Sequence, residues 1–175
     1  KIAHMLTNLN KSYNDLFDYS TEVKKVINSI FANPKYIGGS DSLDSKIMTI
    51  AKKKIFCKGG AEGVFLFTDL KKGLSGVIKI VDGNERAIPY LIYNLFKKFK
   101  IMNKNELLKL EKYCEYKLIN HANIVVGNVN TKIVWSMLIK LLLVKVVVSN
   151  NKMNSYLYLG SILLNNRIII ELKLK

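Results

Sequence analysis

A glycine-rich segment that follows a short apolar run places the tightest constraint on the fold of this chain. Ile55-Phe56-Cys57 is β-prone, and Lys58-Gly59-Gly60-Ala61-Glu62-Gly63-Val64 places three glycines within five residues. Glycines in a strand leave the backbone without side-chain cover, so another group can approach it closely. The sequence therefore predicts a strand whose first half carries apolar side chains and whose second half exposes its backbone, with the amine of Lys58 between the two halves.

Two further segments predict strands that follow the first. Residues 64–67 and 77–81 are rich in β-branched, aromatic and other apolar side chains, and Asp69-Leu70-Lys71-Lys72-Gly73 suits a hairpin turn. Short glycine-containing connections join neighbouring antiparallel strands. The three segments therefore predict an antiparallel meander.

Apolar residues at helical spacing predict helices around this meander. One starts at Thr21 and ends at Asn33-Pro34, and a short one starts at Asp41 or Ser42. Others span about Glu85 to Lys100 and Lys104 to Leu118, and residues 124–129 predict a last strand. We expect these side chains to face inward: Val23, Val26, Ile27, Ile30, Leu43, Ile47, Met48, Ile50, Ile88, Leu91, Ile92, Leu95, Phe96, Phe99, Leu107, Leu110, Cys114 and Leu118. Helices packed on an antiparallel sheet define an α+β fold.

The chain is strongly basic, with 28 Lys and Arg against 13 Asp and Glu and a net charge of +15. Such a charge attracts nucleic acid through counterion release. However, 26 of the 28 are lysine, and the runs at 52–54, 71–72 and 97–98 fall at predicted helix ends, turns and polar faces, where water solvates them. AT-rich coding and a solvated surface explain this composition. We therefore expect neither a nucleic-acid nor a membrane partner.

Several landmarks recur in a known family in the same order. They are Asn33-Pro34, Ile37-Gly38-Gly39, Asp44, the segment 58–64, Gly73, Ile78-Lys79-Ile80, Asp82-Gly83 with Arg86-Ala87, and Val126-Gly127. From Asn33 to about Asn130 the chain resembles the carboxyl-terminal half of the bacterial asparaginase II family, the rhizobial type of L-asparaginase. The resemblance implies a fold like that of serine β-lactamases and penicillin-binding proteins. It also implies hydrolysis of the side-chain amide of asparagine by serine-lysine pairs.

The resemblance implies a catalytic role for Lys58. A serine nucleophile needs a base, and a lysine serves as one when burial or a second cation lowers its pKa. Gly59 and Gly60 would admit the substrate close to the backbone. Asp44, where some relatives have cysteine, is a candidate substrate-binding residue, with helix capping as the alternative. Glu62 is a second candidate, with a local hydrogen bond as the alternative.

The nucleophile is not evident in this chain. Ser149-Asn150-Asn151-Lys152 has the Ser-x-x-Lys spacing, but it follows the Lys58 strand instead of preceding it. The resemblance implies that the serine, its lysine, and the cysteine and lysine that bind a metal such as zinc in some members lie upstream of residue 1. We therefore expect an inactive fragment without a cofactor or metal of its own. A homodimer is the oligomer considered, and the absence of a visible signal peptide suits a cytoplasmic enzyme.

The resemblance ends near residue 130. Residues 133–148 are almost wholly apolar, but Lys140 and Lys145 interrupt them, and they are shorter than the roughly 20 apolar residues that span a bilayer. We expect residues 1–130 to form the carboxyl-terminal part of an asparaginase II-like domain. Residues 131–175 would be an unrelated tail, either a lineage-specific extension or, as we favour, the translation of a shifted reading frame.

Other polar and sulfur-containing residues favour structural roles. Cys57 lies in an apolar strand and is predicted to be a buried thiol, and neither it nor Cys114 has metal-ligand spacing. Asp82 and Arg86 are predicted to form an ion pair that ties the strand end to the next helix, with substrate binding as the alternative. The alternative to an asparaginase-type amidohydrolase is a catalytically silent, basic binding or interaction module.

Overall fold

The computed structural model describes residues 2–114, 117–136, 141–150, 153–164 and 167–173. The strands β1 (Ile55–Gly60), β2 (Val64–Asp69) and β3 (Leu74–Ile80) form the predicted antiparallel meander. Gly73 closes the β2–β3 turn by donating its N–H to the carbonyl of Asp69 at 3.0 Å. The α+β prediction is confirmed.

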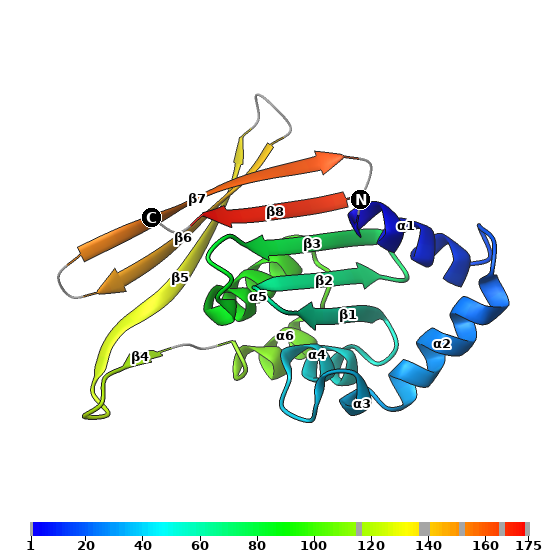
Figure 1. Ribbon diagram of the computed structural model, residues 1–175, viewed down its shortest axis with the longest axis horizontal. Coiled ribbons are helices and arrows are strands. Elements are labelled where there is room, and N and C mark those ends of the chain that lie inside the picture. Colours follow the sequence, from blue (N-terminus) through cyan, green and yellow to red (C-terminus); the bar gives the residue numbers. More distant parts are fainter. Residues whose placement is uncertain (1, 115–116, 137–140, 151–152, 165–166, 174–175) are drawn as a thin grey trace.

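The described sheet continues beyond the meander in the order β1-β2-β3-β8-β7-β6-β5-β4 (Figure 1). β8 (Arg167–Lys173) pairs with β3 in parallel, and it is followed by β7 (Met153–Leu164), β6 (Leu141–Asn150), β5 (Val125–Ser136) and β4 (Lys117–Ile119). The pairs β8–β7, β7–β6, β6–β5 and β5–β4 are antiparallel. The β3–β8 pair is thus the one parallel contact described in the sheet.

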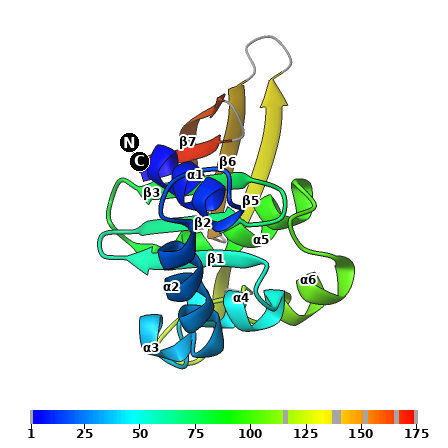
Figure 2. The same ribbon diagram turned by 90° about the vertical axis from the view of Figure 1, so that its right-hand side faces the viewer.

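Six helices are described in the first two thirds of the chain. They are α1 (Ile2–Tyr13), α2 (Ser20–Ala32), α3 (Lys35–Gly38), α4 (Leu43–Ala51), α5 (Ile88–Lys98) and α6 (Lys104–Glu111), and a 3₁₀ turn at Glu85–Ala87 precedes α5. In both ribbon views α3 and α4 lie below β1, the edge strand of the meander (Figure 1, Figure 2). This position brings the start of α4 to the bare end of β1.

The helices α1 and α5 cover opposite faces of the meander. Successive side chains of β2 alternate between the two faces. Phe67 packs edge-to-face on Phe96 of α5, with ring centroids 5.1 Å apart. The neighbouring Thr68 accepts a hydrogen bond from the buried Asn10 of α1 at 3.0 Å. Burial of both faces holds the strands in a fixed register.

The predicted inward face of α5 is largely confirmed. Leu91, Leu95 and Phe96 are fully buried, and Phe99 is partly buried against the same core. The α-helix begins later than expected because Asn84 accepts from the N–H of Arg86 and starts a 3₁₀ turn first. The prediction that this helix packs across the meander is confirmed.

Four sequence-based details are wrong. The strand predicted at residues 124–129 is not the last one, because β5 extends to Ser136 and β6, β7 and β8 follow it. Val26 is 59% exposed, because α2 buries a narrower stripe that contains Ile27 and Phe31. β3 ends at Ile80, and Val81 is exposed. The last predicted helix ends at Glu111, where the N–H groups of residues 113 and 114 donate to the carbonyls of residues 110 and 111 and form turns. Leu118 belongs to β4 instead of this helix.

Candidate active site

The site forms where the start of α4 meets the end of β1. Ser42 caps α4 by accepting from the N–H of Ser45, as one of the two predicted caps. Asp44 lies in the first turn of this helix, where the helix dipole favours a carboxylate. Lys58 and Gly59 lie in the second half of β1. Residues separated by 14 or 15 positions in sequence thus become direct neighbours.

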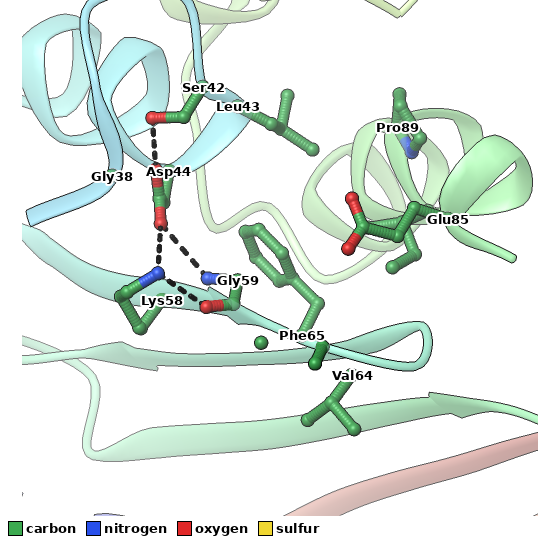
Figure 3. A pocket seen from close by; sticks show the side chains of 13 residues that line it. Gly38, Ser42, Leu43, Asp44, Lys58, Gly59, Val64, Phe65, Glu85 and Pro89 are labelled. Atoms are coloured by element: carbon green, nitrogen blue, oxygen red, sulfur yellow. Dashed lines mark hydrogen bonds and ion pairs between the residues drawn. The ribbon is translucent and has the colours of Figure 1, made fainter. Parts of the chain in front are cut away.

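The carboxylate of Asp44 accepts four hydrogen bonds. Figure 3 draws those from Ser42, Lys58 and Gly59. Its Oδ2 accepts from Lys58 Nζ at 3.2 Å and from the N–H of Gly59 at 3.0 Å. Its Oδ1 accepts from the N–H of Ser45 at 2.8 Å and from the hydroxyl of Ser42. The side chain of Asp44 is only 3% exposed, whereas that of Lys58 is 40% exposed. Asp44 is therefore a buried anchor that fixes a more accessible amine.

Two opposing effects set the pKa of Asp44. Burial raises the pKa, but the hydrogen bonds from Ser42, Gly59, Lys58 and Ser45 together lower it below the ordinary value. Asp44 is consequently ionised at neutral pH. Burial also raises the pKa of the Cys57 thiol well above its ordinary value, and Sγ lies 3.5 Å from the carbonyl of Asp44. Cys57 is therefore a buried structural thiol, as predicted.

Gly38 makes room for the Asp44 carboxylate. A Cβ atom at residue 38 would lie 2.2 Å from Asp44 Oδ1 and 2.6 Å from Ser42 Oγ. A Cβ atom at Gly59 would instead make ordinary contacts, 3.7 Å from Asp44 Oδ2 and 3.9 Å from the Phe65 ring. The close approach of the end of α3 to the site therefore requires glycine at residue 38.

The Lys58–Asp44 pair opens into a pocket of about 400 Å³ (Figure 3). The backbone of Gly59 and Gly60 forms one wall, and Phe65 and Pro89 contribute apolar surface. The complete lining is Gly38, Ser42, Leu43, Asp44, Lys58, Gly59, Gly60, Ala61, Val64, Phe65, Glu85, Ile88 and Pro89. A cavity of this kind, mostly apolar with a few converging polar groups, suits a small polar ligand.

The structure brings together most of the predicted site residues. Lys58, Gly59, Gly60 and Asp44 all line the pocket. Glu62 does not: it lies in the β1–β2 turn at φ 58°, its side chain is 84% exposed, and its carboxylate is 3.8 Å from Lys79 Nζ. The roles assigned to these residues in catalysis and substrate binding remain predictions.

The surroundings of Lys58 differ from those expected for a lysine base. We expected burial or a second cation beside the amine. Instead, the side chain is partly exposed and its charged neighbour is the carboxylate of Asp44. A carboxylate is the usual partner of a charged lysine, so this geometry positions the amine without the burial or the second cation expected of a lysine base.

Sequence reasoning missed two polar residues of the pocket. Ser42 was considered only as a helix cap, although its hydroxyl also donates to Asp44. Glu85 was considered only as the start of a helix, yet its carboxylate faces the cavity across from Lys58 (Figure 3). The sequence did contain a signal for Ser42, because it precedes Asp44 by two residues and can therefore reach its carboxylate. No pattern in the sequence indicated Glu85.

The remaining structural expectations concern residues around the pocket. Arg86 Nη2 lies 3.3 Å from Asp82 Oδ2, which confirms the predicted ion pair. Across the residues that the structure describes, no group of three His, Cys, Asp or Glu side chains is placed to hold a metal ion. Over the same residues, no helix has both the length and the apolar character needed to cross a bilayer.

The sequence model of the L-asparaginase II family matches residues 1–131. The chain belongs to the L-asparaginase II family. This match confirms the resemblance inferred from the landmarks between Asn33 and Asn130, and the family is one of asparaginase-type hydrolases. A comparison with curated proteins gives no match.

The L-asparaginase II match includes the whole meander and the six helices described. It ends within β5, so β6, β7 and β8 lie outside it. The division of the chain at residue 130, the unrelated origin of the tail, and the likeness to serine β-lactamases remain predictions. All the residues that line the pocket lie inside the match.

Proposed function

We propose that this chain supplies the lysine half of a serine-lysine asparaginase site. The observation that carries the proposal is the pocket in which Lys58, its buried partner Asp44 and the bare Gly59-Gly60 backbone meet, inside the part matched by the L-asparaginase II family. The reaction is hydrolysis of asparagine to aspartate and ammonia. The substrate is small and polar, which agrees with the size and lining of the pocket.

In this mechanism Lys58 acts as the base. The step starts from the uncharged amine of Lys58, whose Nζ removes the proton from a serine hydroxyl while the serine oxygen attacks the side-chain carbonyl carbon of asparagine. The proton then passes to the amide nitrogen, the C–N bond breaks, and ammonia leaves an acyl intermediate. Water attacks this ester, the serine oxygen leaves with a proton, and aspartate is released. Asp44 holds Nζ in position and stabilises the ammonium that forms when Nζ takes up a proton.

Ser42 is a poor candidate for the nucleophile. It carries the one side-chain hydroxyl among the described residues that line the pocket, and that hydroxyl donates to Asp44 Oδ1. The lowered pKa of Asp44 makes its carboxylate a weak base. We propose that the nucleophilic serine belongs to a segment upstream of residue 1 and enters the open side of the pocket.

The zinc used by some members of the family would depend on the same upstream segment. The described part of this chain gathers no set of three metal-binding side chains, so it does not fit a zinc ion by itself. No step of the proposed mechanism passes through a metal. The chain's own contribution is the base, its anchor and the wall of the pocket.

A titration with L-asparagine tests whether the pocket accepts the substrate. In two-dimensional ¹⁵N–¹H NMR spectra of the 175-residue chain, asparagine should shift the backbone signals of Gly59 and Gly60. Gly76 is the internal control, because it lies in the core against the Phe67 ring. Shifts confined to the pocket glycines support the proposal. An unchanged spectrum at saturating asparagine would favour the silent interaction module.

A further inference from the structure

A single acidic side chain of the pocket is free to meet a ligand. Glu85 lies in the 3₁₀ turn before α5, is exposed, and lines the cavity opposite the Lys58–Asp44 pair (Figure 3). Its carboxylate takes part in none of the side-chain hydrogen bonds or ion pairs found among the described residues. A carboxylate in this position offers an unsatisfied negative charge to whatever enters.

The other carboxylates near the pocket are already occupied. Asp44 accepts four hydrogen bonds, one of them from the amine of Lys58. Asp82 is paired with Arg86 and also accepts from the N–H of Asn84. Glu62 lies outside the lining, near Lys79. Within the described structure, Glu85 is thus the acid best placed to bind a cation inside the cavity.

Asparagine brings such a cation to the site. Besides the amide, it carries an α-ammonium and an α-carboxylate, and the amide must point toward Lys58 if this lysine is the base. The opposite end of the molecule then lies toward the Glu85 side. Phe65, Ile88 and Pro89 provide apolar walls between the two ends. Such walls reduce solvent screening of an ion pair.

We propose that Glu85 binds the α-ammonium of the substrate and thereby selects free α-amino acid amides. The inference rests on the proposed function, since it assigns the amide end to Lys58. It excludes amides that lack the α-ammonium, such as succinamate, and amides whose α-nitrogen is acylated. Glu85 is a specificity-determining residue and takes no part in proton transfer.

Isothermal titration calorimetry on the 175-residue chain tests this assignment. The two ligands are L-asparagine and succinamate, which differ only in the α-ammonium group. The parent should bind asparagine more tightly than succinamate. Glu85→Gln should lose about three- to tenfold in asparagine affinity, as expected for an exposed charged hydrogen bond, and should bind succinamate within about twofold of the parent.

Two further variants serve as controls. Glu22→Gln makes the same chemical change at an exposed residue of α2 outside the pocket lining and should bind both ligands as the parent does. Glu85→Asp should keep the preference for asparagine. Circular dichroism spectra that match the parent show that each variant is folded.

The outcomes separate the inference from the proposed function. A parent that binds asparagine, together with a Glu85→Gln variant that binds it equally well, overturns the role of Glu85 and leaves the proposed function intact. A parent that binds neither ligand overturns both. Equal losses of asparagine and succinamate affinity in Glu85→Gln would show a structural effect and also overturn the assignment.

Discussion

Replacing Asp44 with asparagine should destabilise the protein, because each oxygen of the carboxylate accepts two hydrogen bonds. Oδ1 accepts from Ser45 and Ser42, and Oδ2 accepts from Gly59 and Lys58. In Asp44→Asn one oxygen becomes an NH₂ group, so a donor faces the backbone N–H of either Ser45 or Gly59. Neither rotamer of the amide relieves this conflict.

The expected loss follows from these contacts. A buried backbone N–H left without an acceptor costs about 1–3 kcal/mol. Loss of the ion pair with Lys58, whose side chain is 40% exposed, adds less than about 1 kcal/mol because solvent screens it. We therefore expect Asp44→Asn to lower the free energy of unfolding by about 2–4 kcal/mol.

Urea unfolding followed by circular dichroism measures this change, with an unchanged m-value as the sign of an intact two-state transition. Asp41→Asn is the matched control, because the Asp41 side chain is fully exposed although it pairs with Lys46 at 3.4 Å. This control should remain within about 0.5 kcal/mol of the parent. A loss below about 0.5 kcal/mol in Asp44→Asn would refute the anchoring role of the carboxylate.

The difference in unfolding free energy between the parent and Asp44→Asn should also depend on pH, which gives an independent check. The pKa of Asp44 is lower in the folded protein than its ordinary value of 3.8. Its ionised form therefore stabilises the protein above the unfolded-state pKa, and this contribution is lost as the pH falls through the folded-state pKa. The stability gap between parent and Asp44→Asn should consequently shrink below about pH 4. A gap that stays constant down to pH 2 would contradict the pKa direction.

Three further predictions concern the site and the core. Gly38→Ala should disrupt the hydrogen bonds of Asp44 and lower the urea midpoint of unfolding. Gly59→Ala, whose Cβ meets only ordinary contacts, should unfold at the parent midpoint. Equal midpoints for the two variants would contradict the close contact between residue 38 and Asp44. Leu95→Ala, at a fully buried position, should cost about 2–5 kcal/mol in urea unfolding, while Leu108→Ala, at a position 66% exposed, should stay within about 0.5 kcal/mol. The 175-residue chain alone should release no ammonia from asparagine above background, and measurable turnover would place the nucleophile inside this chain.

The parts of the fold that the sequence predicted are those with a strong local pattern. The meander follows from apolar runs separated by glycine-containing turns, and α5 follows from its regular stripe of Leu91, Leu95 and Phe96. The helix α1 was missed because its buried face includes Asn10, whose amide donates to Thr68 and to the carbonyl of Asp69. A buried polar side chain interrupts the hydrophobic period on which a helix prediction depends.

The sequence likewise predicted only those parts of the candidate site that have a local motif. Lys58 and its glycines stand out because an amine beside bare backbone is a recognisable local motif. The contact between Lys58 and Asp44 depends on how α4 docks against β1, which no local pattern specifies. Glu85 reaches the pocket only because the β3–α5 connection returns to this end of the meander. Tertiary proximity of this kind could not be inferred from spacing along the chain.

The most direct test of the central claim is ammonia release by Lys58→Met in the polypeptide that joins this chain to its proposed serine-bearing upstream segment. Methionine keeps most of the length and the apolar stem of lysine but has no titratable group. Lys79→Met is the control, because Lys79 lies outside the pocket lining and is 3.8 Å from Glu62. Removal of the base should reduce the rate by about two to four orders of magnitude, with Lys79→Met close to the parent. A folded Lys58→Met enzyme within about threefold of the parent rate would contradict the assignment of Lys58 as the base.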